Sequence, residues 1–285
     1  MHDPKPAAFG GATCVALALA LALPVAGCKR RHVPVDASPE LGYPACEDIG
    51  GRDAGTVVAQ GHLRAGPLSQ EKNVAESFEL QRTACGYLLR SRQEWPLAIS
   101  DVEVFYDAGL TPLWAWKRMT IAGSRRADGN ADIRRYELRT GEVFIKRRDA
   151  EGRVTQEKLL PGGRMAAPVE AHVGAVVGPG RGLITAWLKR AKLPVGGKVH
   201  ELVLDFREMV EMLEIASLER NPDQFEPSLG RTVRVYTFFG RETVFADQDD
   251  VVIADLAGMR PSDSLSTPEP EPLPMYGAPD PRNTP

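Results

Sequence analysis

The chain has 285 residues, of which 43% are hydrophobic and 26% are charged, as in an ordinary globular domain. Its 35 basic and 38 acidic residues give a formal net charge of -3. A nucleic-acid-binding protein normally carries a basic excess, so nucleic acid is not an expected partner.

An uncharged, mainly apolar run occupies residues 11–25. It is shorter than the roughly 20 residues that a membrane-spanning helix needs, and it therefore predicts a secretory signal. The run ends in Val25-Ala26-Gly27-Cys28, which resembles the lipobox of bacterial lipoproteins processed by signal peptidase II. The resemblance implies that residues 1–27 are removed and that Cys28 becomes the lipid-linked first residue. An ordinary cleaved signal and an uncleaved anchor are the alternatives.

The residue after the predicted lipid site is Lys29. In lipoproteins of Gram-negative bacteria an aspartate at this position commonly signals retention in the inner membrane. The resemblance thus implies attachment to the outer membrane, facing the periplasm. Each buried CH₂ group of the acyl chains contributes ~0.8 kcal/mol, so the membrane is the expected partner through a permanent lipid anchor. The basic triplet Lys29-Arg30-Arg31 can also be a simple polar flank of the apolar run.

Four cysteines are present, and Cys14 falls in the predicted signal. With Cys28 assigned to the lipid, Cys46 and Cys85 form an even pair in an oxidising compartment, and a disulfide between them is expected. A closed loop of roughly 40 residues would stabilise the fold by about 4 kcal/mol. No Cys-x-x-Cys motif or histidine cluster accompanies the pair, so neither a metal nor a cofactor is expected.

Changes in composition divide the chain into four parts. The predicted signal (1–27) precedes a tether (28–45) that contains three prolines and no hydrophobic period, and is expected to be semi-extended. A β-rich periplasmic domain is expected over 46–260. The remaining residues, 261–285, are rich in proline, serine, threonine and glutamate, and this composition predicts a disordered tail.

Short segments of β-branched and aromatic residues, bounded by turn residues, recur throughout 46–260 and predict strands. They cover 56–59, 77–82, 87–92, 102–106, 113–121, 133–138, 143–147, 154–160, 199–206, 231–239, 242–247 and 251–256. Asp107-Ala108-Gly109 predicts one hairpin turn, and Gly240-Arg241 predicts a two-residue type II′ turn. The segment 209–220 is compatible with a helix or a strand, and its β neighbours favour the strand.

Residues 161–181 contain several glycines and prolines and predict a long irregular connection. The next segment, 182–193, predicts the amphipathic helix of this chain. Its apolar stripe is Leu183, Ile184, Trp187, Leu188 and Ala191, and its basic side is Lys189, Arg190 and Lys192. We expect this helix to plug the concave face of a sheet, and the alternative is a helix that rests on anionic lipid.

These elements predict a mainly β fold, with a curved antiparallel sheet or half-barrel and one amphipathic helix packed across it. The order of strands and helix between about residues 54 and 257 is similar to that of half-barrel proteins of the bacterial periplasm. This similarity is one of layout and includes no shared residue motif.

Two segments resemble a metal-binding and a dinucleotide-binding motif, but neither motif is complete. His200-Glu201 begins like a zinc-protease helix, but Leu204 stands where the second histidine is needed and the segment predicts a strand. Gly178-x-Gly180-x-Gly182 lacks the third glycine of a dinucleotide site, because Leu183 stands in its place. No catalytic residue is assigned.

The expected function is therefore a non-enzymatic one. It is a lipid-anchored module that binds an apolar ligand or an envelope protein, or that serves the structure of the envelope. Trp114, Trp116 and Trp187 are the candidate ligand-binding residues, since large aromatic side chains line apolar pockets. The alternative is a lipid-anchored hydrolase whose carboxylate pair the sequence does not identify.

Overall fold

The predicted mainly β fold with one packed helix is confirmed. A computed structural model describes residues 33–34, 55–66, 69, 73–121, 131–138, 143–148, 154–159, 172–207 and 211–262. Within these ranges the chain forms two sheets and a helix, α1 (Arg181–Ala191). No described helix is both long and apolar enough to cross a membrane.

The first sheet, sheet A, has ten antiparallel strands: an eight-stranded meander with one short strand added at each edge. Its consecutive strands are β2 (Thr56–Ala65), β3 (Ala75–Thr83), β4 (Gly86–Trp95), β5 (Ala98–Tyr106), β6 (Pro112–Ile121), β7 (Ala131–Glu137), β8 (Val143–Arg148) and β9 (Val154–Leu159). β1 (Val33–Pro34) pairs with β9, and β16 (Met259–Pro261) pairs with β2. Side chains alternate between the two faces, so each strand sends every second residue to the core.

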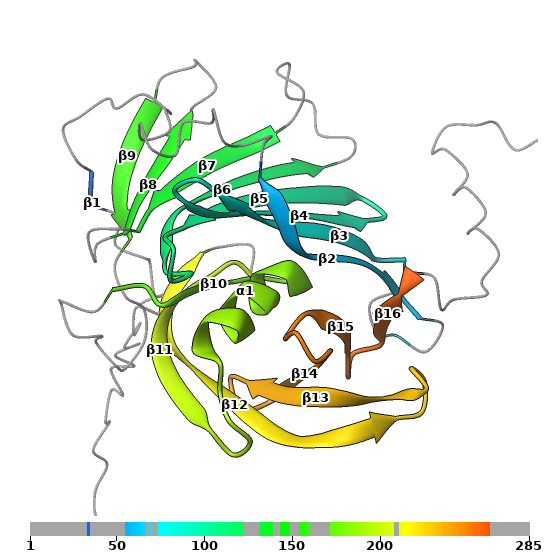
Figure 1. Cartoon of the computed structure of the whole chain (residues 1–285). Coiled ribbons are helices and arrows are strands. Elements are labelled where there is room, and N and C mark those ends of the chain that lie inside the picture. Colours follow the sequence, from blue (N-terminus) through cyan, green and yellow to red (C-terminus); the bar gives the residue numbers. More distant parts are fainter. Residues whose placement is uncertain are drawn as a thin grey trace, which may run out of the picture.

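The second sheet, sheet B, has six strands and curls below sheet A in Figure 1. They are β10 (Ala175–Val177), β11 (Lys198–Asp205), β12 (Met212–Glu226), β13 (Arg231–Phe238), β14 (Glu242–Ala246) and β15 (Val252–Asp255). Its strands are antiparallel except that β10 runs parallel to β11. β16 then returns the chain to sheet A, so the two sheets enclose a common interior.

Helix α1 lies in this interior, between the two sheets (Figure 1). Leu183 and Ala186 belong to the core cluster of sheet A, whereas Ile184 and Trp187 pack in the cluster of sheet B. Every residue from Arg181 to Leu188 is buried, and only the last turn reaches the surface. This is the position expected of a plug and not that of a helix lying on lipid.

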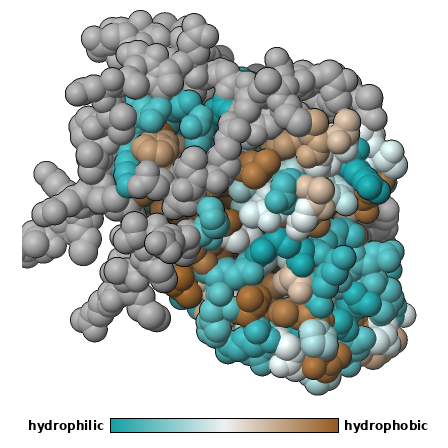
Figure 2. Space-filling view, turned by 60° about the vertical axis from the view of Figure 1, so that its left-hand side comes forward, coloured by the Kyte–Doolittle hydropathy of each residue, from teal (hydrophilic) through white to brown (hydrophobic). Residues whose placement is uncertain are grey.

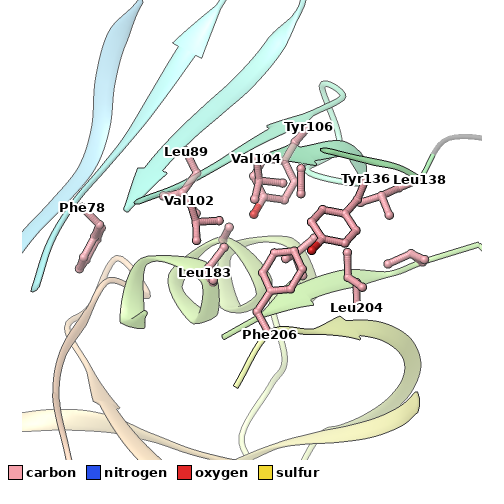
Figure 3. Close-up of a cluster of buried hydrophobic side chains, with 14 of the residues drawn as sticks. Phe78, Leu89, Val102, Val104, Tyr106, Tyr136, Leu138, Leu183, Leu204 and Phe206 are labelled. Atoms are coloured by element: carbon pink, nitrogen blue, oxygen red, sulfur yellow. The ribbon is translucent and has the colours of Figure 1, made fainter. Parts of the chain in front are cut away.

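The main core cluster joins sheet A, α1 and the start of sheet B (Figure 3). Leu89 and Val104 come from sheet A and point towards Leu183 of the helix. On the other side of the cluster the rings of Tyr136 and Phe206 meet with their centroids 4.8 Å apart. Hydrophobic and hydrophilic residues are mixed over the coloured part of the surface in Figure 2.

The close approach of α1 to β3 and β4 depends on glycine. A Cβ atom added at Gly182 would lie 2.5 Å from the Cβ of Phe78, and one added at Gly180 would lie 2.7 Å from Ser91 Oγ. Neither position leaves room for a side chain of any size. Gly180 and Gly182 therefore have a packing role at the start of the helix.

The segment left open by the sequence, 209–220, contributes to a strand, as the β neighbours favoured. β12 continues past the predicted end to Glu226, and its pairing with β13 shifts register between Asn221 and Gln224. Asn221-Pro222 is typical of a turn, but a β-bulge accommodates the proline here because the bulged residue needs no ladder hydrogen bond.

Two further local predictions were wrong. The connection over 161–181 is not irregular throughout, because residues 175–177 form β10, a strand too short to show a period. The β13–β14 hairpin has a three-residue loop, Phe239 to Arg241, instead of a two-residue turn, since Phe238 pairs with Glu242. Both Phe239 (φ 52) and Gly240 (φ 69) adopt the left-handed conformation there.

Two short edge strands lie where the sequence predicts irregular chain. β1 falls within the predicted tether, and β16 ends at Pro261, the first residue of the predicted tail. The outer strands of a meander leave N–H and C=O groups unpaired, and such edges recruit short segments of extended chain. The rest of the predicted signal, tether and tail lies outside the described residues.

Candidate functional site

The three tryptophans proposed for ligand binding do not come together. Trp187 is 2% exposed and packs between α1 and sheet B, where its Nε1 donates to Glu201 Oε2 at 3.0 Å. Trp114 and Trp116 lie on β6, on the face of sheet A that points away from α1. Sheet A thus lies between Trp187 and the other two tryptophans.

Each outer-face tryptophan has its own surroundings. Trp114 is buried, stacks on Phe105 with ring centroids 6.0 Å apart, and lies below the guanidinium of Arg135 at 5.4 Å. Trp116 borders a shallow groove of about 400 Å³ that also contains His62 and Arg90. The groove is lined mainly by polar and charged side chains, as expected of the wet face of an antiparallel sheet.

Most of the cysteines predicted to carry the lipid or to form the disulfide lie outside the described residues. Cys28 and Cys46 are outside the described residues, whereas Cys85 lies in the exposed turn between β3 and β4. Lipidation of Cys28 and the Cys46–Cys85 disulfide therefore stay predictions.

The pocket that best suits a ligand lies beside α1, under the β13–β14 hairpin, and is named here the hairpin pocket. Its volume is about 500 Å³, within the range of small-molecule sites. Its lining residues come from four segments of the chain: Gly178, Pro179, Arg181 and Ile184; Arg207; Phe238, Arg241, Glu242, Thr243 and Val244; and Asp255, Leu256 and Ala257. The pocket exists only because the folded sheet B curls around the helix.

The hairpin pocket has an apolar part and a charged part. Ile184, Phe238 and Val244 are buried side chains of its wall, and Leu256 at its rim is 70% exposed. A largely exposed leucine next to buried apolar residues continues the apolar wall to the opening.

An ion pair forms the inner charged wall of the hairpin pocket. Arg181 Nε donates to Asp255 Oδ2 at 2.8 Å, and Arg181 Nη1 donates to the carbonyl of Pro179 at 2.6 Å. Asp255 Oδ1 accepts from the backbone N–H groups of Gly258 and Met259 at 2.8 and 2.9 Å. The side chains of Arg181 and Asp255 are both buried, and their hydrogen bonds offset the free energy lost when these charges leave water.

A second ionic group, centred on Arg207, forms the outer charged wall. Arg207 pairs with Asp205, Glu214 and Glu242, and its guanidinium stacks over the ring of Phe239 at 3.6 Å. The left-handed conformation of Phe239 thus places its ring below the arginine. This contact connects the end of β11 to the β13–β14 loop.

The two carboxyl groups behind Arg207 titrate differently. Burial opposes the ionisation of Asp205, but its hydrogen bonds with Arg207 hold the pKa of Asp205 below its usual range. Burial and the neighbouring Asp205 raise the pKa of Glu214 to about 7. The two carboxyl groups share a hydrogen bond and both pair with Arg207, so they are part of one ionic network.

Glu76 is the third charged group near the helix start. It lies on β3, is completely buried, and its Oε1 accepts from the backbone N–H of Gly182 at 3.0 Å. The helix has no N-cap side chain of its own, so this carboxyl group from sheet A caps it. Burial raises the pKa of Glu76 from its ordinary 4.5 to about 7, against the opposing charge of Arg181.

No part of the sequence pattern pointed to Arg181, Asp255 or Glu76. The hydrogen bonds that build this site join Arg181 to Asp255, 74 residues apart, and Glu76 to the backbone of Gly182, 106 residues apart. The one available signal was the presence of Arg181 in a glycine-rich segment before an apolar helix. Within the described ranges, no three His, Cys, Asp or Glu side chains are grouped so as to hold a metal ion.

Comparison with known proteins places the chain near no described family. No family model matches the sequence, and no curated protein matches it. Among solved structures, a DUF1089 family protein from Pseudomonas aeruginosa is 12% identical with a TM-score of 0.44, covering 69% of this chain and 96% of that one. A beta-barrel-like protein of domain of unknown function DUF1849 from Brucella abortus is 13% identical with a TM-score of 0.37, covering 68% of this chain and 82% of that one.

Proposed function

We propose that this protein is a lipid-anchored, non-enzymatic binding module of the bacterial envelope. It is held at the periplasmic side of the outer membrane by the lipid on Cys28 and binds an apolar ligand, or an apolar segment of an envelope protein, in the hairpin pocket. The lipobox resemblance and Lys29 support the location.

The observation that carries the binding role is the apolar wall of the hairpin pocket. Ile184, Phe238 and Val244 line a space of about 500 Å³ that opens beside the exposed Leu256. Transfer of apolar ligand surface from water to such a wall is favourable by roughly 25 cal/mol per Å². The charged groups of the pocket are paired with one another, an arrangement that suits orienting a ligand more than transferring protons.

The test is affinity capture from a detergent-solubilised envelope, with both lipids and proteins analysed. Thr243 is half-buried on β14 and lines the pocket, so Thr243→Trp should fill the space. We expect a lipid or protein species that copurifies with the wild type to fall about tenfold with this variant, a loss of about 1.4 kcal/mol in binding.

The matched control is Thr232→Trp, an exposed position on β13 outside the pocket lining. It should capture the same species as the wild type. If both tryptophan variants capture the same species in equal amounts, the hairpin pocket is not the binding site.

A further inference from the structure

Two neighbouring buried residues on the inner face of sheet A each have one acceptor oxygen without a partner. Glu76 and Gln93 are directly paired across β3 and β4, and both side chains are buried. Glu76 Oε2 and Gln93 Oε1 have no hydrogen-bond partner among the described residues. An acceptor left unpaired in the interior costs about 1 to 3 kcal/mol, so each of these oxygens needs a donor.

The other atoms of these two side chains are already in use. Gln93 Nε2 donates to the carbonyl of Pro179 at 3.4 Å, which directs Gln93 Oε1 away from that carbonyl. Glu76 Oε1 accepts from Gly182 at the start of α1. A single proton on Glu76 Oε2 can be donated to Gln93 Oε1, and it satisfies both remaining oxygens at once.

The charged groups that face Glu76 determine how well a negative charge on its carboxyl group is stabilised. Arg181 Nη1 is 3.8 Å from Glu76 Oε2, beyond hydrogen-bond distance, and the guanidinium is directed to Asp255. Asp255 itself is a like charge. β2 contributes the apolar Leu63 opposite Glu76, and β4 contributes only uncharged polar groups there. The hydrogen bonds of the Arg181 guanidinium thus go to Asp255 and Pro179, and Glu76 Oε2 has only the 3.8 Å electrostatic contact with Arg181.

We propose that Glu76 is a proton-controlled junction between sheet A and α1. When Glu76 is protonated, its carboxyl group donates to Gln93 Oε1 and accepts from the N–H of Gly182, and α1 is held against sheet A. When the proton leaves to solvent, Gln93 Oε1 loses its donor, and a buried negative charge with no hydrogen-bonded cation remains beside the Arg181–Asp255 pair. The packing of α1 against sheet A, and with it the inner wall of the hairpin pocket, becomes weaker.

The direction of the pH effect follows from the raised pKa. The Glu76 pKa is about 7 in the folded chain and 4.5 when unperturbed, so between these values the folded state binds more protons than the unfolded state. Stability is therefore fully present below 4.5 and is lost as the pH rises through about 7. The ratio of folded to unfolded protein should fall on the order of 10²-fold across this window.

The test compares wild type and Glu76→Gln as detergent-solubilised lipoproteins, by thermal unfolding at about pH 5 and about pH 8. Glutamine is neutral at both values, and its amide can still donate to Gln93 and accept from Gly182. We expect the wild-type midpoint to fall by several degrees between the two pH values and the Glu76→Gln midpoint to stay higher at about pH 8. A variant that is less stable than wild type at both values would overturn the proposal.

Glu211→Gln is the matched control for a buried glutamate. Glu211 Oε1 accepts from the Tyr136 hydroxyl at 2.6 Å and pairs with Arg134, and although burial opposes it, these contacts lower the pKa of Glu211. Since this carboxylate is charged at both pH values, its replacement should lower the midpoint at both and leave the pH dependence of the wild type in place.

A direct readout is the NMR titration of the side-chain carboxyl carbons. The resonance that is missing in Glu76→Gln should titrate near pH 7 in the wild type. Titration at the ordinary glutamate value of 4.5 would show that another donor, such as a water molecule, satisfies Gln93, and it would refute the proposal.

Discussion

At the residue scale, single atoms decide how closely α1 can approach sheet A. The backbone of Gly182 rests against Phe78, and its N–H is capped by Glu76. A helix that carried a side chain at this point would stand further from β3, and the cap would lengthen. The same residue therefore serves packing and helix capping.

Gly182→Ala should destabilise the fold by about 1 to 3 kcal/mol, the usual cost of overpacking a core, even though alanine is the better helix former. The added Cβ would lie 2.5 Å from the Cβ of Phe78, a part of the side chain that cannot move without the backbone. Denaturant unfolding monitored by circular dichroism measures the loss.

Gly109→Ala is the control for this substitution. Gly109 is exposed in the β5–β6 turn, and its added Cβ would meet only Asp107 Oδ1, at 3.3 Å. Its effect should stay within about 0.5 kcal/mol, as for most surface substitutions. Equal losses at the two positions would contradict the close-packing explanation.

At the scale of elements, α1 supplies apolar residues to both sheets at once. Its Leu183 side faces sheet A and its Ile184 side faces sheet B. At the C-terminal end, Lys189 Nζ donates to the carbonyl of Asp249 at 2.7 Å, and Arg190 pairs with Glu201. The basic residues thus hold the last turn to sheet B and its loops.

Trp187→Ala should lower the free energy of unfolding by about 3 to 5 kcal/mol, because it removes a fully buried side chain and the hydrogen bond to Glu201. Denaturant midpoints of the wild type and the variant give the measurement. Trp116→Ala, at a half-buried outer-face position, should cost clearly less. Matching midpoints for wild type and Trp187→Ala would be incompatible with the buried helix.

The elements themselves were largely predictable. The meander of sheet A, the β5–β6 hairpin and the helix follow from hydrophobic period and turn residues, which act over a few neighbours. β10 and β16 were missed because three residues are too few to show a period, and each is stabilised by pairing with a distant strand. The bulge at Pro222 was missed for a related reason: only the pairing with β13 shows that the strand continues.

At the scale of the whole molecule, the predicted attachment to the membrane depends on the N-terminal segment. Palmitate-analogue labelling of cells should mark the wild-type protein and fail to mark Cys28→Ser, because the thioether requires the cysteine sulfur. Cys14→Ser, which changes the other cysteine of this region, should label like the wild type. Equal labelling of Cys28→Ser and the wild type would disprove the lipid site.

Taken alone, the sequence determined the β-rich class, most strand positions and the amphipathic helix over 182–193, because each depends on contacts between near neighbours in the chain. It also predicts the lipid site, the disulfide and the tail, which lie largely outside the described residues. Tertiary structure alone decided that Trp114 and Trp187 lie apart, and that Glu76, Arg181 and Asp255 meet. Hydrogen bonds between residues 74 and 106 positions apart form only when both sheets close around α1, and no local pattern encodes that closure.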